Sequence, residues 1–503
     1  MTLAFLAVAG FGAANHELWR DEAQPWLVAL HSNSLLELFQ RVKFEGHPGL
    51  WYTCLYLLSR VTASPLAMQA LHVAIAGAAV WVVARYAPFT SLQRVLFAFG
   101  YFPLYEYAVL SRDYGLGMLL LLACCAALGA RTTRFPVLLA LIALIPHTNV
   151  FAAIVGLALG ITLLADRWLP GGPVLGARVT GRQLAAGGLL VIVSVALAVL
   201  QTLPPANFHV ELGARPRLEP RFLVKRFRTL VPALMPIPRP GPDWWMLSSH
   251  DSWWEWPRWR APAGLAAYAL LSWMVLGLVR RLRALIFLGT AIIGLVTFMY
   301  LKFPGEARHF GYLFVALVMA IWLGKIEDAR RGTIAEGWIG RAWASTQGSV
   351  FTALLAVHAV GGLSAVYLER RYVFAEGKPA AHYLVEHGLE GAPLVAQHDF
   401  VQGVLVYLGR KEAYFVRSDR LGSFGMWEKE RFPPVTDSTC VARAGQIAAE
   451  QHRPAVLLAN HALELTGADS LDTHELARFT GSVVGDEDFY LYSVGGSVAR
   501  PTN

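Results

Sequence analysis

The sequence predicts an α-helical polytopic membrane protein with a small α/β domain at its C-terminal end. Of its 503 residues, 55% are hydrophobic and only 16% are charged, and the mean hydropathy is +0.44. So few charges cannot cover a soluble globule of this size. Up to about residue 370 the apolar residues fall in long blocks, and after it short strand-like and helix-like segments alternate.

Eleven apolar segments predict about 11 transmembrane helices. The first, Met1–Ala14, lacks the basic start of a signal peptide and is short for a span, which needs about 20 residues. Either Asn15–Trp19 completes this helix or the chain starts late. The other predicted spans cover residues 66–84, 95–111, 114–130, 135–148, 149–165, 183–202, 262–279, 284–301, 309–324 and 347–366.

Two further segments are predicted to lie at the membrane surface as juxtamembrane helices. Leu50–Leu58 is followed by Arg60 and is too short to span. Pro25–Leu38 mixes apolar and polar residues like an amphipathic helix resting on a bilayer. They belong to a first extracytoplasmic loop over residues 15–65.

The basic residues set the predicted orientation. The net charge of +8 comes from arginines at the ends of apolar blocks, which orient helices and call for no nucleic-acid partner. With a cytoplasmic N-terminus and Leu50–Leu58 at the surface, the cluster Arg280-Arg281-Leu282-Arg283 is cytoplasmic, as the positive-inside rule requires. The long extracytoplasmic loop 203–261 runs against that rule, which long loops obey weakly, with Arg215, Arg217, Arg221, Lys225, Arg226 and Arg228.

This topology brings five polar motifs to the extracytoplasmic face, where charges at a membrane boundary are costly. Such convergence is the usual mark of a site. The motifs are Arg20-Asp21-Glu22, Glu45-Gly46-His47-Pro48, Arg112-Asp113-Tyr114, Pro146-His147-Thr148-Asn149 and the segment 302–309.

The order of these motifs resembles the GT-C class of membrane glycosyltransferases, in particular bacterial relatives of protein O-mannosyltransferases and of the lipid A aminoarabinose transferase. The matching elements are Asp21-Glu22 after the first helix, His47-Pro48-Gly49-Leu50, Arg112-Asp113-Tyr114 at a helix start, and the basic loop Lys302–His309. The resemblance covers most of residues 1–370. Gly49 stands where the family often has a second proline, and Arg308-His309 where Arg-Tyr is commoner.

The resemblance implies a transmembrane catalytic domain over residues 1–370 and an extracytoplasmic α/β domain over 371–503. It further implies an inverting glycosyltransferase that uses a polyprenyl-phosphate-linked sugar donor. The acceptor would be a lipid, a glycan or a protein. The expected location is the bacterial cytoplasmic (inner) membrane, with the site and the C-terminal domain on the periplasmic or outer face.

The chemistry expected of such a donor needs one carboxylate. Its phosphate leaving group is already acidic, so no second carboxylic acid has to protonate it, unlike in glycoside hydrolysis. Asp21 is the predicted general base that takes a proton from the acceptor. Glu22 would orient the acceptor or help Asp21 hold a divalent cation, Mg²⁺ or Mn²⁺, although no dedicated metal-ligand spacing is present.

Cations are predicted to bind the departing phosphate, since guanidinium groups suit bidentate phosphate contacts. The candidates for this role are Arg112, Lys302 and Arg308. Polar residues of the same motifs are the candidates for substrate binding, and these are Glu45, His47, Tyr114, His147 and His309.

Each candidate also has a purely structural interpretation. Asp21 could cap the helix that follows it, with Pro25 in the first turn. Arg112 could be an interfacial charge that snorkels, and His147 could satisfy a turn. Dense tryptophans in the long loop favour a membrane-interface belt over sugar stacking, and these are Trp244, Trp245, Trp253, Trp254, Trp256 and Trp259.

The C-terminal domain is predicted to recognise the acceptor or to act as a scaffold. It contains no Gly-rich phosphate loop and no nucleophile elbow. Its predicted strands are 394–397, 413–417, 455–459 and 489–493, and its helices 380–386 and 441–451. The cysteines imply no disulfide framework, since Cys54, Cys124 and Cys125 lie in apolar segments and only Cys440 in a polar one.

Three other functions remain open at the level of sequence. A transporter or flippase of lipid-linked glycans would place ionisable residues within several spans, where His72, Glu106 and His358 form no evident chain. An O-antigen polymerase or ligase would depend on basic residues without Asp21. A non-catalytic scaffold would tolerate substitution of all the candidate residues.

Overall fold

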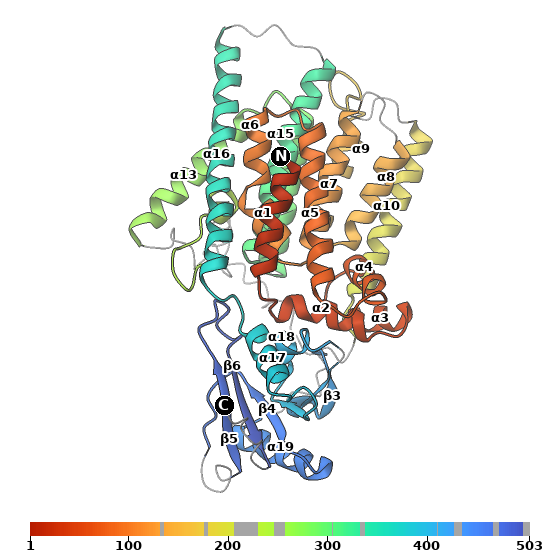
Figure 1. The fold of residues 1–503 in the computed structure, drawn as a ribbon. Coiled ribbons are helices and arrows are strands. Elements are labelled where there is room, and N and C mark those ends of the chain that lie inside the picture. Colours follow the sequence, from red (N-terminus) through yellow and green to blue (C-terminus); the bar gives the residue numbers. More distant parts are fainter. Residues whose placement is uncertain are drawn as a thin grey trace.

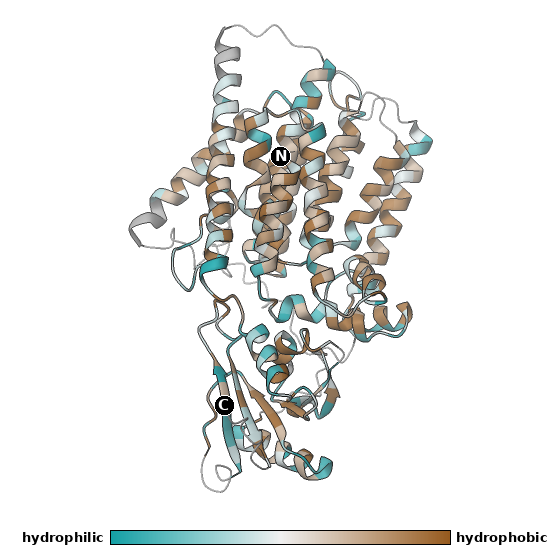
Figure 2. Cartoon of the chain, in the orientation of Figure 1, coloured by the Kyte–Doolittle hydropathy of each residue, from teal (hydrophilic) through white to brown (hydrophobic). Residues whose placement is uncertain are grey.

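A bundle of helices makes up most of the molecule, and the C-terminal sheet lies beyond one end of it (Figure 1). Hydrophobic residues run along the bundle helices, and hydrophilic residues gather near their ends (Figure 2). That distribution is the one a membrane-embedded bundle requires. The computed structural model describes residues 1–130, 135–175, 180–205, 230–245, 257–303, 305–331, 338–409, 411–426, 435–465 and 472–495.

Five described helices are long and apolar enough to cross a membrane, namely α5 (Leu66–Tyr86), α10 (Gly181–Thr202), α14 (Leu282–Leu301), α15 (Ala307–Arg331) and most of α16 (Trp338–Arg371). Shorter apolar helices in the bundle are α1 (Thr2–Asn15), α7 (Tyr114–Gly129), α8 (Phe135–Leu144), α9 (Val150–Ala165) and α13 (Pro257–Leu276). The chain is a helical membrane protein, and the total of about 11 spans stays a prediction.

The predicted span over residues 95–111 is not one unbroken helix. The segment contains two elements, α6 (Ser91–Ala98) and the π-helical η1 (Phe102–Val109). The helix α6 ends at Ala98, and Pro103 lies in the first turn of η1, where its missing N–H leaves no hydrogen bond unmade. All residues of η1 are buried, and it leads directly to Ser111 and Arg112.

The prediction of a single amphipathic helix over Pro25–Leu38, resting on the membrane surface, is wrong. Two helices occupy this region, α2 (Arg20–His31) and α3 (Leu35–Val42). Ser34 starts the second helix, because its side chain accepts a hydrogen bond of 3.1 Å from the Glu37 amide. Nine residues of α2 are buried, so this helix does not rest on a bilayer.

The region around α2 is closed by two neighbouring elements. The helix α4 (Leu50–Ser59) packs against α2 and α3 at the end of the bundle (Figure 1). Short turns complete the bundle, η2 (Ile145–His147) after α8 and α12 (Leu230–Leu234) before α13. The six basic residues between Arg215 and Arg228, in the predicted long loop, lie outside the described residues.

Two tryptophans predicted to form a membrane-interface belt are instead part of the protein core. Trp244 is fully buried and Trp245 is 4% exposed. The Trp245 indole donates a hydrogen bond of 3.1 Å to Glu106, and its ring lies 5.1 Å from that of Trp19. The belt interpretation is therefore wrong for this pair, and the side chains of Trp253, Trp254, Trp256 and Trp259 lie outside the described residues.

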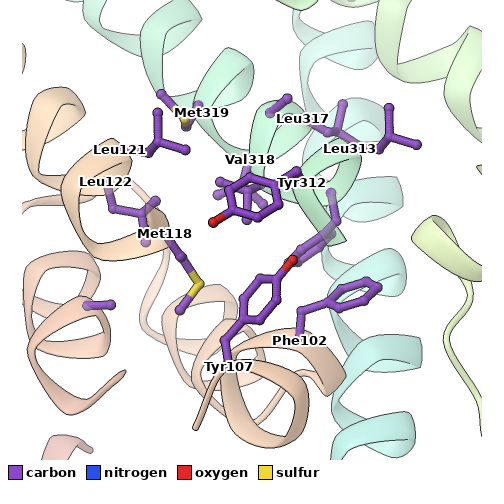
Figure 3. Close-up of a cluster of buried hydrophobic side chains, with 14 of the residues drawn as sticks. Phe102, Tyr107, Met118, Leu121, Leu122, Tyr312, Leu313, Leu317, Val318 and Met319 are labelled. Carbon is purple, nitrogen blue, oxygen red and sulfur yellow. The ribbon is translucent and has the colours of Figure 1, made fainter. Parts of the chain in front are cut away.

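A cluster of buried side chains joins η1, α7 and α15 (Figure 3). Tyr107 and Tyr312 lie with ring centroids 5.7 Å apart. The Tyr107 hydroxyl donates to the Arg308 carbonyl at 2.6 Å, and the Tyr312 hydroxyl donates to the Tyr114 carbonyl at 2.9 Å. The cluster thus fixes the first turns of α15 and α7 relative to each other.

The C-terminal domain is built on a six-stranded mixed sheet with strand order β3-β2-β1-β4-β6-β5. The central strand β1 is parallel to β2 and β4, and the other pairs are antiparallel. The strands are β1 (Leu394–Ala396), β2 (Ala413–Phe415), β3 (Arg420–Gly422), β4 (Ala455–Ala459), β5 (Thr473–Phe479) and β6 (Phe489–Val494). The helices are α17 (Gly377–Glu386), α18 (Gln402–Leu405) and α19 (Asp437–Gln451), and short 3₁₀ turns are η4 (Asp399–Val401) and η5 (Val416–Ser418).

The two faces of the sheet bury different neighbours. Val395 of β1 packs with α19, whereas Leu394 and Ala396 face the opposite way, as alternation along a strand requires. That second face shares one hydrophobic cluster with α17, α18 and α2, which contributes Trp26 and Leu27. The helix α2 is therefore part of both the bundle and the C-terminal domain. All four cysteines are free thiols.

A buried ionic network closes the end of the bundle away from the sheet. Arg283 is completely buried, with Nε 2.5 Å from Asp166 and Nη1 3.1 Å from Glu327. Its Nη2 donates to the Gly172 carbonyl at 2.5 Å. Two carboxylates and a carbonyl satisfy the buried guanidinium, which ties together the ends of α9, α14 and α15.

Replacing Arg283 with alanine should therefore lower the free energy of unfolding by about 3–5 kcal/mol, because Asp166 would be buried without its cation and Glu327 would keep only the partly exposed Arg331, 3.3 Å away. The measurement is the unfolding transition of the protein in detergent. Arg281→Ala is the matched control, since its partner Asp328 is 46% exposed, and it should cost under about 1 kcal/mol. Equal losses in the two variants would contradict a structural role for the network.

Candidate active site

Asp21 lies in the first turn of α2, at the end of the bundle that faces the C-terminal domain. The residue before the helix is Trp19, and no side chain caps this end. Asp21 is one residue inside the helix, so it does not act as the cap that the structural interpretation assigned to it. Its side chain remains 31% exposed.

Two arginines from distant parts of the chain flank the Asp21 carboxylate. Oδ2 lies 3.2 Å from Arg308 Nη2 and 3.7 Å from Arg112 Nη1. Arg112 also donates to the Asp21 carbonyl, and Arg308 forms a second ion pair of 2.6 Å with Glu306. Two of the three predicted phosphate-binding cations thus lie beside the predicted base.

The charges around Asp21 change its acidity. Burial alone would raise the pKa of this carboxyl, but Arg112, Arg308 and Arg20 outweigh burial and lower its pKa below the ordinary value. The carboxylate is therefore fully ionised near neutral pH. Its basicity depends on whether the arginines remain bound to it.

Glu22 points away from Asp21 into a buried network. One oxygen lies 2.6 Å from His16 Nε2, and the other accepts a hydrogen bond of 2.5 Å from the Ser111 amide. His16 Nδ1 lies 2.9 Å from Glu369, at the end of α16. Both ring nitrogens face carboxylate oxygens, which is the arrangement of a doubly protonated imidazole. This network fixes α2 against η1 and α16.

Glu45, in the first loop, is a second carboxyl that contacts α2, through Gln24. It accepts hydrogen bonds of 2.6 Å from Gln24 and 3.1 Å from Tyr52. Burial raises the pKa of Glu45 to about 7, although the bond from Gln24 acts in the opposite direction. Glu45 therefore changes its charge near neutral pH.

The remaining motif residues form two pairs. His47 Nδ1 lies 3.3 Å from Asp113, the residue before α7. Tyr114 contacts His309 Nε2 at 2.8 Å, and His309 Nδ1 accepts from the Glu306 amide at 2.8 Å. Because Nδ1 accepts, Nε2 carries the proton and donates to the tyrosine oxygen. Both pairs link the loop at the start of α7 to the first loop or to the start of α15.

Two predicted site residues do not join this cluster. Lys302 is exposed at the end of α14, and no described residue forms an ion pair with it. His147 faces α10, with Ser194 at 3.2 Å and Gln201 at 3.3 Å. Gln201 in turn accepts a 3.0 Å hydrogen bond from the Gly49 amide, so His147 supports the first loop from a distance.

Three buried donors near Asp21 have no hydrogen-bond partner among the described residues. They are Trp19 Nε1, Ser111 Oγ and Arg308 Nε. Arg308 also lies over the Trp19 ring, 5.4 Å from its centroid. Buried donors are nearly always paired in folded proteins, so this group can donate to a ligand that is rich in acceptor oxygens.

A divalent cation was predicted to be a possible ligand of Asp21 and Glu22. In the part of the chain that the structure describes, no three His, Cys, Asp or Glu side chains gather as a metal site. Arginines bind Asp21, while His16 and Ser111 occupy both oxygens of Glu22. As they lie, the two carboxylates do not fit a divalent-cation site, and a requirement for Mg²⁺ or Mn²⁺ stays an untested prediction.

The chain is similar over its whole length to ArnT from Cupriavidus metallidurans. It matches the apo crystal structure with a TM-score of 0.53 and the structure bound to undecaprenyl phosphate with 0.52. Each match has 13% sequence identity and covers 99% of both chains. The chain has the ArnT fold. No protein-family model and no curated protein sequence matches it.

Within this ArnT fold, the C-terminal domain contributes contacts that sequence analysis missed. Arg20, next to Asp21, forms an ion pair with Asp486, and its amide donates to Glu487 at 3.1 Å. Gln24 forms two hydrogen bonds with the Gly425 backbone, of 2.9 and 3.0 Å. No local motif marks these partners, which lie more than 400 residues further along the chain.

Asp113 and Glu306 were also absent from the predicted site, although both lie inside motifs that the sequence displays. Each is the acidic neighbour of a predicted cation or aromatic residue. An acid within two residues of an arginine, at a membrane boundary where charges are costly, is a usable signal for an ion pair, although Asp113 pairs with His47 and not with its neighbour Arg112. Glu369 also lies directly beside an arginine, Arg370, but nothing in the sequence points to His16 as its partner.

Replacing Glu22 with glutamine should destabilise the ArnT-fold bundle by about 3 kcal/mol, because His16 loses one of its two buried carboxylate partners. The midpoint of thermal unfolding in detergent measures this loss. Glu37→Gln is the control, because its ion pair with Arg41 on α3 is partly exposed and is worth about 0.5 kcal/mol. A Glu22→Gln variant as stable as the control would contradict the fixing role of this network.

The stability of the protein should also depend on pH through Glu45. In the unfolded chain its pKa is about 4.3, below the folded value of about 7, so the folded state binds this proton more tightly. That contribution is fully present below about pH 4 and is lost as pH rises through 7. Glu45→Gln should therefore flatten the loss of stability between pH 5 and 8, measured by unfolding at each pH. An unchanged slope would contradict the raised pKa.

Proposed function

We propose that the protein is an inverting glycosyltransferase that moves a sugar from a polyprenyl-phosphate donor to an extracytoplasmic acceptor. The observation that carries the proposal is the Asp21 carboxylate flanked by Arg112 and Arg308, at one end of a bundle with the ArnT fold. One of the matching ArnT structures is bound to undecaprenyl phosphate, which supports a lipid-phosphate donor for this chain.

The two arginines would bind the phosphate of the donor. Guanidinium groups bind phosphate through two parallel hydrogen bonds and stabilise the negative charge that grows as the sugar leaves. The unpaired donors Trp19 Nε1, Ser111 Oγ and Arg308 Nε would add hydrogen bonds to phosphate or sugar oxygens. Lys302, exposed at the end of α14, would attract the anionic donor to the site.

Asp21 would act as the general base, and donor binding would make it a better one. In the free protein its pKa is lowered by the arginines. A phosphate that takes over part of their hydrogen bonding would weaken this effect and add a negative charge nearby, which raises the pKa of Asp21. The carboxylate could then accept the proton of the acceptor hydroxyl or amine.

The reaction is a single displacement. The acceptor oxygen or nitrogen attacks the anomeric carbon as Asp21 removes its proton, and the bond to the phosphate oxygen breaks. The lipid phosphate leaves with the electron pair of that bond and needs no proton, since it is an acidic leaving group. Attack opposite the leaving group inverts the anomeric configuration.

The residues around this centre would hold the sugar and the acceptor. Glu45, His47, Tyr114 and His309 lie on elements that meet at Asp21, and their charges and hydroxyl groups suit sugar hydroxyls. His147 would act indirectly through Gln201 and the first loop. The distribution of arginines supports an extracytoplasmic site, and the similarity to a bacterial ArnT supports our proposal that this side is the periplasmic face of a bacterial inner membrane.

Asp21→Asn should lower the transfer rate by about 100-fold or more, because an amide cannot accept the proton. Binding of the donor should stay equal or become tighter, because the amide frees both arginines. The measurement uses protein in lipid, a panel of radiolabelled polyprenyl-phosphate sugars and membrane extract as the acceptor source. Asp328→Asn, at the opposite end of the bundle, is the matched control and should transfer at the wild-type rate.

The other outcomes separate the alternative functions. Full activity of Asp21→Asn with loss of activity in Arg112→Ala and Arg308→Ala would favour an O-antigen polymerase or ligase. Silent substitutions at all three positions would favour a non-catalytic scaffold. Movement of labelled lipid across the bilayer without transfer of sugar would favour a flippase.

A further inference from the structure

A cavity of about 920 Å³ lies between α8, α9 and α10. Most of its lining is apolar and includes Leu138, Leu157 and Val191. On its outer side α10 is the least buried of the five long helices, and Ile192 in the lining is 67% exposed. The cavity is therefore bordered by a helix surface that requires lipid as its neighbour.

This cavity is separate from the proposed active site. Its lining includes Phe135 at the start of α8, Asp166 after the end of α9, and Gln183 near the start of α10. The opposite ends of these helices carry His147 and Gln201, which connect to the first loop and Asp21 side of the bundle. The cavity thus lies at the end of the bundle away from the C-terminal sheet.

One end of the cavity is cationic. Arg167 and Arg330 line it, with Asp166 as the single acidic residue of the lining. Asp166 is fully buried and bonded to Arg283 at 2.5 Å and to the Val174 amide at 2.9 Å. The negative charge of Asp166 is therefore compensated by Arg283, which does not line the cavity. The neighbouring Trp168 is 78% exposed, as expected of an aromatic residue at a membrane interface.

Arg330 is held in a fixed position. Its guanidinium donates to the carbonyls of Val174 and Leu175 at 2.7 and 3.0 Å, and to that of Leu128. Carbonyl oxygens fix the orientation of the group without removing its formal charge. An anion at this end would meet a cation that needs little further ordering.

We infer that this cavity binds one glycerophospholipid of the surrounding bilayer, with its phosphate at Arg167 and Arg330 and an acyl chain between α8, α9 and α10. A basic group at one end of an apolar cavity between transmembrane helices matches the charge and shape of such a lipid. An extended peptide does not match, because the apolar lining would leave its backbone groups without hydrogen-bond partners. The inference does not depend on the proposed transferase function.

Two glycines in the lining allow the cavity to be filled. A Cβ atom added at Gly160 or at Gly188 would have no heavy atom within 4 Å, so leucine at either position would occupy cavity space. Gly289 of α14 has the same open surroundings and does not line the cavity. Gly289→Leu is therefore a matched control for an added side chain on a bundle helix.

Native mass spectrometry of the full chain, purified in one mild detergent, tests the inference. Wild type and Gly289→Leu should retain one phospholipid per chain, and Gly160→Leu and Gly188→Leu should lose most of it. Equal retention in all four proteins would mean ordinary annular lipid only, and it would overturn the proposal. A retained mass that corresponds to a polyprenyl phosphate would overturn the choice of occupant.

A second measurement avoids any folding defect of the leucine variants. Delipidated protein is reloaded from detergent micelles that contain phosphatidylglycerol or diacylglycerol with the same acyl chains. Wild type should prefer the phosphate lipid, and Arg167→Gln should reduce that preference about fivefold, as expected for one surface cation. An unchanged preference in this variant would overturn the assignment of the phosphate end.

Discussion

The pairing of His16 with Glu22 and Glu369 is the constraint on which the candidate site depends. Three ionisable side chains are completely or almost completely buried there, and each would be costly without its partners. Only one placement of α2 brings Glu22 to both His16 and the Ser111 amide. Since Asp21 precedes Glu22 and Arg112 follows Ser111, the same contacts bring the predicted base and one of its arginines together. Removing the pair would therefore disturb the site without touching a reacting group.

The C-terminal domain completes this constraint from the other side of α2. Trp26 and Leu27 are buried in the cluster that also contains the sheet, and Gln24 bonds to the Gly425 backbone. Arg20 connects to Asp486 and Glu487 on the turn before β6. A helix held by the bundle through one face and by the sheet through another has little freedom to tilt. These contacts favour positioning of α2 over mere attachment as the role of the C-terminal domain.

Sequence analysis located the helices because membrane spans need long apolar segments, a requirement that hydropathy detects directly. It failed where tertiary contacts decided the outcome, as in the burial of Trp244 and of most of α2. The short strand β3 and the mostly exposed edge strand β5 lack the apolar alternation that marks a strand. Chain topology placed Asp21 and Arg308 on one face, 287 residues apart. Glu369 could not be foreseen as a partner of His16, because nothing local to the end of α16 distinguishes it from an interfacial charge.

Both ends of the bundle bury arginines against carboxylates, yet the two clusters differ in what they leave unsatisfied. Around Arg283 the carboxylates and the guanidinium are enclosed, and their hydrogen bonds stay within the protein. Around Asp21 the carboxylate is 31% exposed, and Trp19, Ser111 and Arg308 each keep a buried donor without a described partner. A cluster whose bonds are all satisfied can only stabilise the fold, whereas one with accessible charge and spare donors can exchange partners with a ligand. That difference, and not the presence of charge near a membrane, is the reason why we propose the Asp21 end, and not the Arg283 end, as the active site.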